Sequence, residues 1–66
     1  MEKLKEKRMS LGYSCNQMAR KLKISKTFYW QLENDERRIS YEMAIKIAEI
    51  FHLKPDELFY DYFKSK

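Results

Sequence analysis

The chain has 66 residues, of which 44% are hydrophobic and 36% charged, and its 14 lysines and arginines against 10 aspartates and glutamates give a formal net charge of +4. A chain of this length forms at most one domain, near the lower size limit for folding without help. One cysteine and one histidine exclude an internal disulfide and a zinc site built from Cys and His, and no apolar run reaches the ~20 residues of a membrane span.

These features predict a soluble, complete, cytoplasmic protein that takes no cofactor, metal or small-molecule ligand. No enzyme is expected, because the carboxylates are scattered and His52 has no evident Ser or Cys partner. The positive charge favours a polyanionic partner, although basic surface charge is as common in proteins where it only aids solubility.

The first two expected helices cover residues 2–10 and 15–22. Gly12 separates them, as a residue that can adopt a positive φ and end the first helix. Ser14 and Gln17 have the spacing of a capping box at the start of the second helix, in which each side chain bonds the other's backbone amide. The buried face of these two helices is predicted to contain Leu4, Met18, Ala19 and Leu22.

Three further helices are expected over residues 26–34, 41–51 and 55–62. Ser25 and Ser40 are the N-cap residues of the first two, and Pro55 occupies the first position of the last. The segment NDERRIS between the third and fourth helices is polar apart from one isoleucine and is expected to form a loop. The predicted fold class is therefore all-α, with residues 1–66 forming a single domain of five helices.

The second and third helices have the spacing of a helix-turn-helix. Ala19 lies in the middle of one helix, Ile24 in the turn, and Tyr29 and Leu32 on the next helix. A small residue at position 19 lets the two helices cross closely, and Ile24 fills the corner between them. Because any helical hairpin can use an alanine at its crossing, this spacing by itself leaves an ordinary hairpin open.

The stretch from residue 4 to residue 59 resembles the Cro/CI-type (XRE-type, lambda-repressor-like) DNA-binding family. The resemblance is carried by Arg8 before LGYS, the S-x-x-x-M-A of the second helix, IS before the third helix, LEN at its end, and IAEIFHLKPDELF. It implies a compact five-helix domain that binds the major groove of double-stranded operator DNA, usually as a homodimer, and represses or activates transcription.

The sequence departs from the family pattern at four positions. Cys15 stands where the family often has a glutamine that touches DNA, and Lys23, Asp35 and His52 stand where it often has glycine. Aspartate and histidine tolerate a positive φ better than most residues, so the largest backbone strain is expected at Lys23.

Three consecutive aromatic residues, Phe28, Tyr29 and Trp30, lie on the third helix. At ~100° per residue they cannot share one direction, and with Tyr29 and Leu32 pointing inward, Phe28 falls at the edge of the core and Trp30 is exposed. We expect Trp30 to contact a thymine methyl or the sugar-phosphate backbone. The alternative is that Trp30 folds back over the first helix or fills a contact with another protein.

The outward face of the third helix carries the candidate base-reading residues. Thr27 and Gln31 point away from the predicted core, and Gln can pair with adenine while Thr offers a hydroxyl and a methyl. The family resemblance implies base contacts from Lys26, Thr27 and Gln31, with Phe28 beside them. The full candidate set is Lys26, Thr27, Phe28, Trp30 and Gln31. The alternative is a solvated helix face.

Phosphate contacts are expected from the loop after the third helix and from the start of the second. Arg37 and Arg38 can grip the DNA backbone, unless they pair with the neighbouring Asp35 and Glu36. The candidate phosphate-contacting set is Ser14, Cys15, Asn34, Arg37 and Arg38. The resemblance also implies a structural ion pair between Arg8 and Glu33, which would join the first helix to the end of the third.

The C-terminal segment contains more apolar residues than one short helix can bury. Leu58 and Phe59 are expected in the core, which leaves Tyr60, Tyr62 and Phe63 as a candidate dimer interface. The alternative is that this tail packs over the first helix of its own chain. The favoured function is a sequence-specific transcriptional regulator that binds a two-half-site operator as a homodimer. A protein-interaction module of the same fold, such as an antitoxin or antirepressor-like component, is the rival hypothesis.

Overall fold

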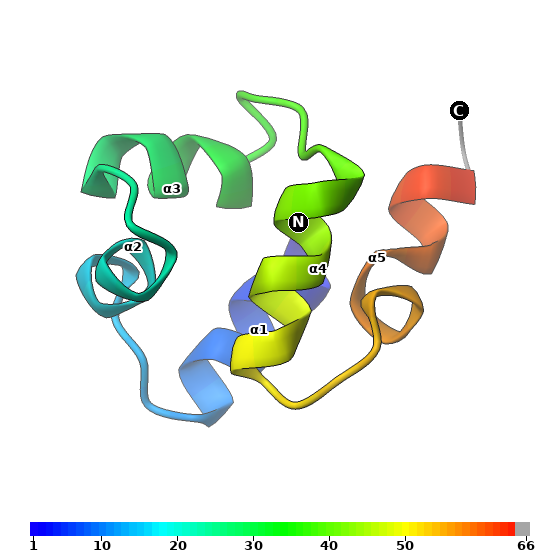
Figure 1. The fold of residues 1–66 in the computed structure, drawn as a ribbon, viewed down its shortest axis with the longest axis horizontal. Coiled ribbons are helices and arrows are strands. Elements are labelled where there is room, and N and C mark those ends of the chain that lie inside the picture. The colour runs from blue at the N-terminus through cyan, green and yellow to red at the C-terminus, as the bar shows by residue number, and fades with distance from the viewer. Residues whose placement is uncertain (65–66) are drawn as a thin grey trace.

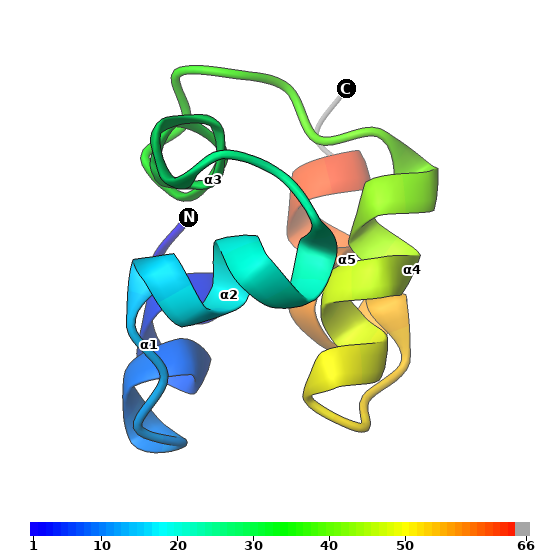
Figure 2. The same ribbon diagram turned by 60° about the vertical axis from the view of Figure 1, so that its left-hand side comes forward.

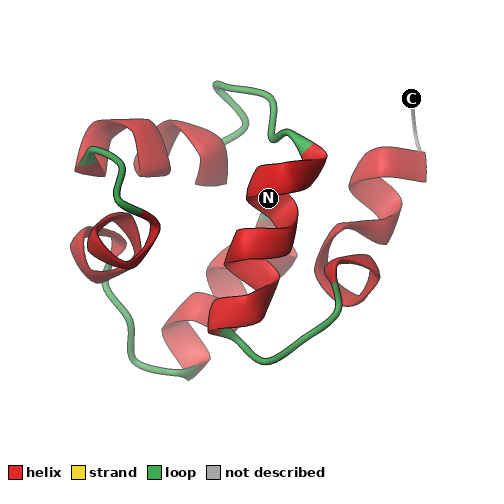
Figure 3. Cartoon of the chain, in the orientation of Figure 1, coloured by secondary structure: helices red, strands yellow, loops and turns green. Residues whose placement is uncertain are grey.

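The computed structural model describes residues 1–64, so the last two positions of the predicted 1–66 domain lie outside the described residues. These residues form five helices and no strand (Figure 3). The helices are α1 (Glu2–Ser10), α2 (Cys15–Leu22), α3 (Lys26–Glu33), α4 (Tyr41–Ile50) and α5 (Pro55–Lys64). The predicted all-α, five-helix fold class is confirmed.

Three serines start three of the helices, as their sequence positions predict. The hydroxyls of Ser14, Ser25 and Ser40 each accept a hydrogen bond from the backbone amide three residues later, at 3.0, 3.0 and 3.1 Å. At α2 the capping box is complete, because Gln17 Oε1 accepts from the Ser14 amide at 2.8 Å. Each cap satisfies a backbone donor that the helix itself leaves unpaired.

The bounds of α1 and α2 agree with the sequence analysis, whereas α3 and α4 each end one residue earlier than the predicted ranges of 26–34 and 41–51. Asn34 and Phe51 are the C-cap residues of these helices. Asp35 and His52 then adopt left-handed conformations, with φ of 61° and 59°. A left-handed residue reverses the chain and ends the helical hydrogen bonding just before it.

The helix-turn-helix pair lies at one end of the molecule, on the far side from α5 (Figure 1). Ala19, 2% exposed, lies among the buried residues that α2 contributes to the core. Ile24 is half-buried in the turn, and its amide donates to the Ala19 carbonyl at 3.0 Å. One hydrophobic core is shared by all five helices, and its most buried large side chains are Leu4, Met18, Tyr29, Leu32, Ile47 and Phe59.

A buried ion pair joins α1 to the C-terminal end of α3. Arg8 Nε and Nη2 donate to Glu33 Oε2 and Oε1 at 2.8 and 3.0 Å, and the two side chains are 11% and 3% exposed. Arg8 Nη1 also donates to the Tyr13 carbonyl at 2.7 Å, and the Tyr29 hydroxyl donates to Glu33 Oε2 at 2.9 Å. These hydrogen bonds compensate both charges for their loss of water.

The same contacts shift the pKa values of the two donors. The hydrogen bonds that Arg8 donates to Glu33 raise the pKa of the Arg8 guanidinium. Burial, reinforced by the Glu33 charge, raises the pKa of the Tyr29 hydroxyl. Tyr29 therefore stays protonated and serves as a donor to Glu33.

The end of α5 differs from the sequence analysis. The helix continues two residues beyond the predicted range of 55–62, to Lys64. Tyr62 and Phe63 are half-buried: the Tyr62 hydroxyl accepts from the Ile39 amide at 2.9 Å, and the Phe63 ring lies edge-on to Tyr41 at 5.7 Å. Tyr62 and Phe63 are therefore only partly exposed, because they also pack against their own chain, whereas Tyr60 is 55% exposed.

We expect Lys23→Gly to raise the free energy of unfolding by about 1 kcal/mol, because Lys23 has a φ of 60° and a left-handed non-glycine residue carries this strain. Lys46→Gly is the matched control in the interior of α4, where it should lower the free energy of unfolding by about 1 kcal/mol. Urea unfolding followed by circular dichroism measures both. Equal losses in the two variants would contradict the assignment of strain to Lys23.

Arg8→Ala should lower the free energy of unfolding by about 3 kcal/mol, because it leaves the Glu33 carboxylate buried without its partner. In a double-mutant cycle, Arg8→Ala and Glu33→Ala should couple strongly. The exposed pair of Lys3 and Asp61, at 3.9 Å, is the matched control and should show no measurable coupling. Additive effects of the two buried changes would rule out the proposed stabilising contact.

Candidate nucleic-acid interface

Helix α3 presents one face to the core and another to solvent. Tyr29 is fully buried, Phe28 is half-buried and Trp30 is 45% exposed, so the three consecutive aromatics have the three environments that the angular analysis predicts. Lys26 and Thr27 are exposed at the N-terminal end of the helix. Figure 2 shows α3 nearly end-on, beside α2 and apart from α4 and α5. Its outward face is the candidate DNA-reading surface.

The inward face holds α3 in place by contacts that do not involve the outward residues. Leu32, which is 1% exposed, and Tyr29 belong to the hydrophobic core. Glu33 is bound to Arg8 of α1, at the opposite end of α3 from its Ser25 cap. The helix is therefore held by its buried face and by the ion pair at its C-terminal end, and its outward side chains can vary without loss of core packing.

Gln31 and Arg37 lie together in the structure. Arg37 Nε donates to Gln31 Oε1 at 3.3 Å, and the Arg37 guanidinium carbon lies 5.3 Å from the centre of the Phe28 ring. Gln31 is half-buried rather than fully exposed. Arg37, which the sequence analysis assigned to the phosphate contacts, is thus placed beside two candidate base-contacting residues.

The acidic residues of the loop do not neutralise its arginines within residues 1–64. Asp35 Oδ2 is paired with the amino group of Met1 at 2.8 Å. Arg38 is exposed, and none of the ion pairs or hydrogen bonds among the described residues involves it. The alternative of mutual pairing between the loop arginines and Asp35 and Glu36 is therefore not observed, and Arg38 presents a charge to solvent.

The N-terminal end of α2 offers backbone amides rather than side chains. The Ser14 hydroxyl is engaged by the Gln17 amide. Cys15 is half-buried, and its Sγ lies 3.9 Å from Glu33 Oε1, so this side chain faces the buried ion pair. By helix geometry, the amides of Cys15 and Asn16 have no acceptor within the helix, and they carry the positive end of its dipole. Such amides are suited to a phosphate oxygen.

Asn34 has a structural contact that the sequence analysis did not assign to it. Its side-chain nitrogen donates to the Trp30 carbonyl at 2.9 Å, at the end of α3. The Trp30 carbonyl also accepts from the Asn34 backbone amide at 3.0 Å, so the side chain adds a second hydrogen bond at this helix end. One of the two N–H donors of Asn34 Nδ2 is therefore engaged, and the second remains for a phosphate oxygen.

The proximity of Arg37 to Gln31 is the feature that sequence reasoning missed. Arg37 follows α3 in the chain, so its position depends on how the loop turns. One signal for this position was available in the sequence: Asp35 stands where the resembling family often has glycine. A left-handed residue there turns the chain back toward the helix that it has just left.

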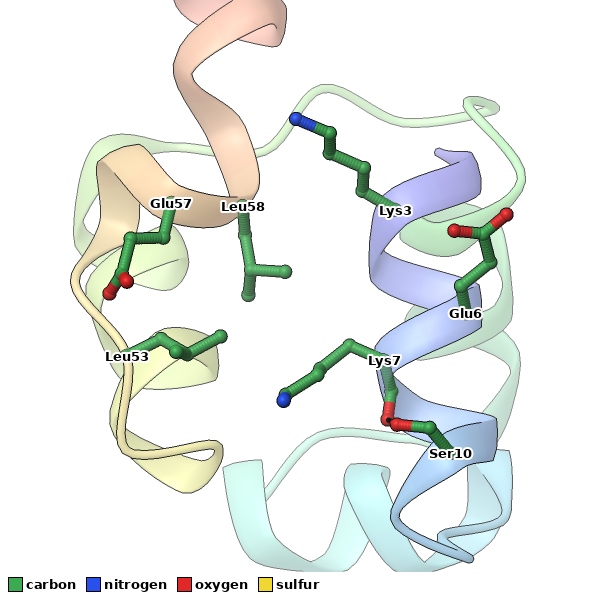
Figure 4. A pocket seen from close by; sticks show the side chains of 7 residues that line it. All are labelled: Lys3, Glu6, Lys7, Ser10, Leu53, Glu57 and Leu58. Carbon is green, nitrogen blue, oxygen red and sulfur yellow. Dashed lines mark hydrogen bonds between the residues drawn. The ribbon is translucent and has the colours of Figure 1, made fainter.

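An open groove of about 440 Å³ lies between α1 and the region around the start of α5. Figure 4 shows the α1 residues Lys3, Glu6, Lys7 and Ser10 on one side of it, and Leu53, Glu57 and Leu58 on the other. Glu57 Oε2 accepts from the Lys54 amide at 2.7 Å, so this carboxylate caps α5. None of the candidate DNA-contacting residues lines the groove.

Two further observations concern the described part of the chain. No helix within residues 1–64 has both the length and the hydropathy needed to cross a membrane. In the same residues, no three Asp, Glu, His or Cys side chains are grouped so that they could bind a metal ion.

Comparison with known proteins agrees with this geometry. A family model described as helix-turn-helix matches residues 4–58, which include most of α1, all of α2 to α4 and the beginning of α5. Neither a curated protein nor a solved structure matches the chain. Because the family match covers most of the chain and includes the α2–α3 pair, the protein belongs to the helix-turn-helix family of DNA-binding domains, of the Cro/CI (XRE) type.

Proposed function

We propose that this protein is a sequence-specific transcriptional regulator that binds a two-half-site operator in double-stranded DNA as a homodimer. The observation that carries the proposal is the division of α3 into two faces. Tyr29, Leu32 and Glu33 hold the helix to the rest of the fold, and its outward residues are free of that task. A helix that is fixed on one side and open on the other is suited to the major groove.

The outward face has the chemistry to read bases. Thr27 supplies a hydroxyl and a methyl group, and Gln31 supplies an amide, which are groups that contact base edges or the thymine methyl. Trp30 offers an apolar surface beside them, for a thymine methyl or a deoxyribose. Lys26, at the N-terminal end of α3, adds a charged donor to the candidate base-contacting residues.

Two positive features flank this face and support phosphate binding. Arg38 is exposed in the loop after α3 and has no acidic partner among the described residues. The second feature is the pair of free amides of Cys15 and Asn16 at the N-terminal end of α2. Phosphate contacts on both sides of a recognition helix set its register in the groove without reading sequence.

A homodimer is proposed because one small module reads too few base pairs for high specificity. Tyr60 on α5 and Tyr41 at the start of α4 are 55% and 57% exposed, although both are large aromatic residues. These two exposed tyrosines form the proposed dimer surface. Tyr62 contacts the loop before α4 and Phe63 contacts Tyr41, and these contacts hold the end of α5 against this part of the chain. In a two-fold dimer, the same surface of each protomer meets its copy.

The rival function is a protein-interaction module of the same fold. The half-buried Phe28 and the exposed Trp30 favour it, because aromatic residues are enriched in protein interfaces. Salt separates the two functions. Binding to DNA should weaken by orders of magnitude between low and moderate salt if about six phosphates are neutralised, whereas an apolar protein contact should hardly respond.

Thr27→Ala and Gln31→Ala should each weaken binding to a selected operator by roughly 1–3 kcal/mol and relax base preference, with non-specific affinity unchanged. Arg38→Ala is the matched change outside the base-reading face: it should weaken binding to all sequences alike and reduce the salt dependence. Fluorescence anisotropy on selected and random duplexes measures both effects. If Gln31→Ala lowers affinity equally on the two duplexes, Gln31 does not read a base.

Tyr60→Lys should weaken self-association, because two-fold symmetry would bring two like charges close together in the interface. Met9→Lys is the matched control, since Met9 is 60% exposed at the end of α1 and lies outside the proposed interface. Sedimentation velocity over a concentration series gives the dissociation constants. An unchanged dimer in Tyr60→Lys, with a folded far-ultraviolet spectrum, would exclude this surface.

A further inference from the structure

We propose that Arg37 is a specificity-determining residue that reads a guanine in the major groove, held in position by Phe28 and Gln31. This inference rests on the proposed DNA-binding function and refines its site. It assigns a base contact to a residue outside α3, in the loop that follows it.

The loop is folded back against α3 by backbone contacts. Asp35 has a φ of 61°, which turns the chain, and the Glu36 amide then donates to the Gln31 carbonyl at 2.8 Å. The Asp35 amide makes a longer bond to the Leu32 carbonyl, at 3.4 Å. Arg37 follows directly after this turn, so its side chain starts beside the last part of α3 instead of pointing away along the loop.

Two side-chain contacts then orient the guanidinium group. Its carbon lies 5.3 Å from the centre of the Phe28 ring, within the range of a cation–π contact, and its Nε donates to Gln31 Oε1 at 3.3 Å. Phe28 and Gln31 are three positions apart on one helix and so lie on the same face. Arg37 is therefore held against the outward face of α3 by two contacts. It loses less side-chain freedom on binding DNA than an arginine without such contacts would.

The remaining part of the guanidinium group matches guanine. Nε is used by Gln31, and no hydrogen bond within residues 1–64 involves Nη1 or Nη2 of Arg37. These terminal amino groups form a planar fork, which can donate to both O6 and N7 of one guanine. Lysine has the same charge but neither the fork nor the planar surface.

The contact also determines what Gln31 can offer to DNA. Because Gln31 Oε1 accepts from Arg37, its amide nitrogen faces away as a donor. A donor suits a base acceptor such as N7 of a purine or O4 of thymine. Arg37 and Gln31 should therefore read adjacent acceptors as one unit.

Arg38 provides the internal comparison. It has the same charge and follows Arg37 directly, but no hydrogen bond, ion pair or ring contact within residues 1–64 links it to α3. A phosphate contact requires only a charge of suitable reach, whereas a guanine contact requires a fixed plane. The two arginines should therefore respond differently to replacement by lysine.

The test is a binding-site selection from random duplexes with the full chain and with its Arg37→Lys and Arg38→Lys variants. Arg37→Lys should lose the preference for guanine at one position of each half-site and bind the wild-type operator about tenfold or more weakly, with an unchanged salt dependence. Arg38→Lys should select the same sequences as the wild type. Thermal unfolding of each variant checks that the fold is intact.

A modified base identifies the contact atom. Replacement of the assigned guanine by 7-deazaguanine removes the N7 acceptor, so it should weaken binding by the wild type and cause little further loss in Arg37→Lys. Retention of the guanine preference by Arg37→Lys, or equal losses from the modified base in both proteins, would overturn the inference. If the wild type selects no sequence and its binding does not depend on salt, the proposed function itself fails, which is a separate result.

Discussion

The buried ion pair between Arg8 and Glu33 is the interaction on which the position of α3 depends. It brings a charged residue of α1 into the interior and binds it to the last residue of α3, with the Tyr29 hydroxyl as a further donor. Two buried charges are costly unless every donor and acceptor is used, and here the buried side-chain polar atoms of the described residues all have partners. The resulting geometry is specific, because a bidentate pair tolerates little rotation.

This arrangement separates stability from recognition within one short helix. Tyr29, Leu32 and Glu33 point inward and hold α3, while Thr27 and Trp30 point outward and take no part in the core. Outward residues can therefore change at little cost to folding, which suits the proposed role of this face in reading DNA. The same separation explains why a fold can be retained while its binding specificity changes.

The connections between helices carry a second constraint. Left-handed residues end α2, α3 and α4, and none of them is a glycine: Lys23, Asp35 and His52 occupy these positions. The conformation is retained in spite of its cost because the turns set the direction of the next element. At Asp35 the turn brings the following loop, with Arg37, back to the face of α3, and the proposed guanine contact depends on this position.

The sequence by itself determined the helices, their caps and the inward and outward faces of α3, because these follow from local hydrogen bonding and from the angular spacing of residues along one helix. The environments of Phe28 and Trp30 were predictable for this reason. Only the tertiary structure decided the position of Arg37 over Phe28 and the packing of Tyr62 under the loop, because both depend on the path of a non-helical segment relative to another helix. Such a path is set by backbone reversal and by contacts between residues distant in sequence, which local periodicity does not encode.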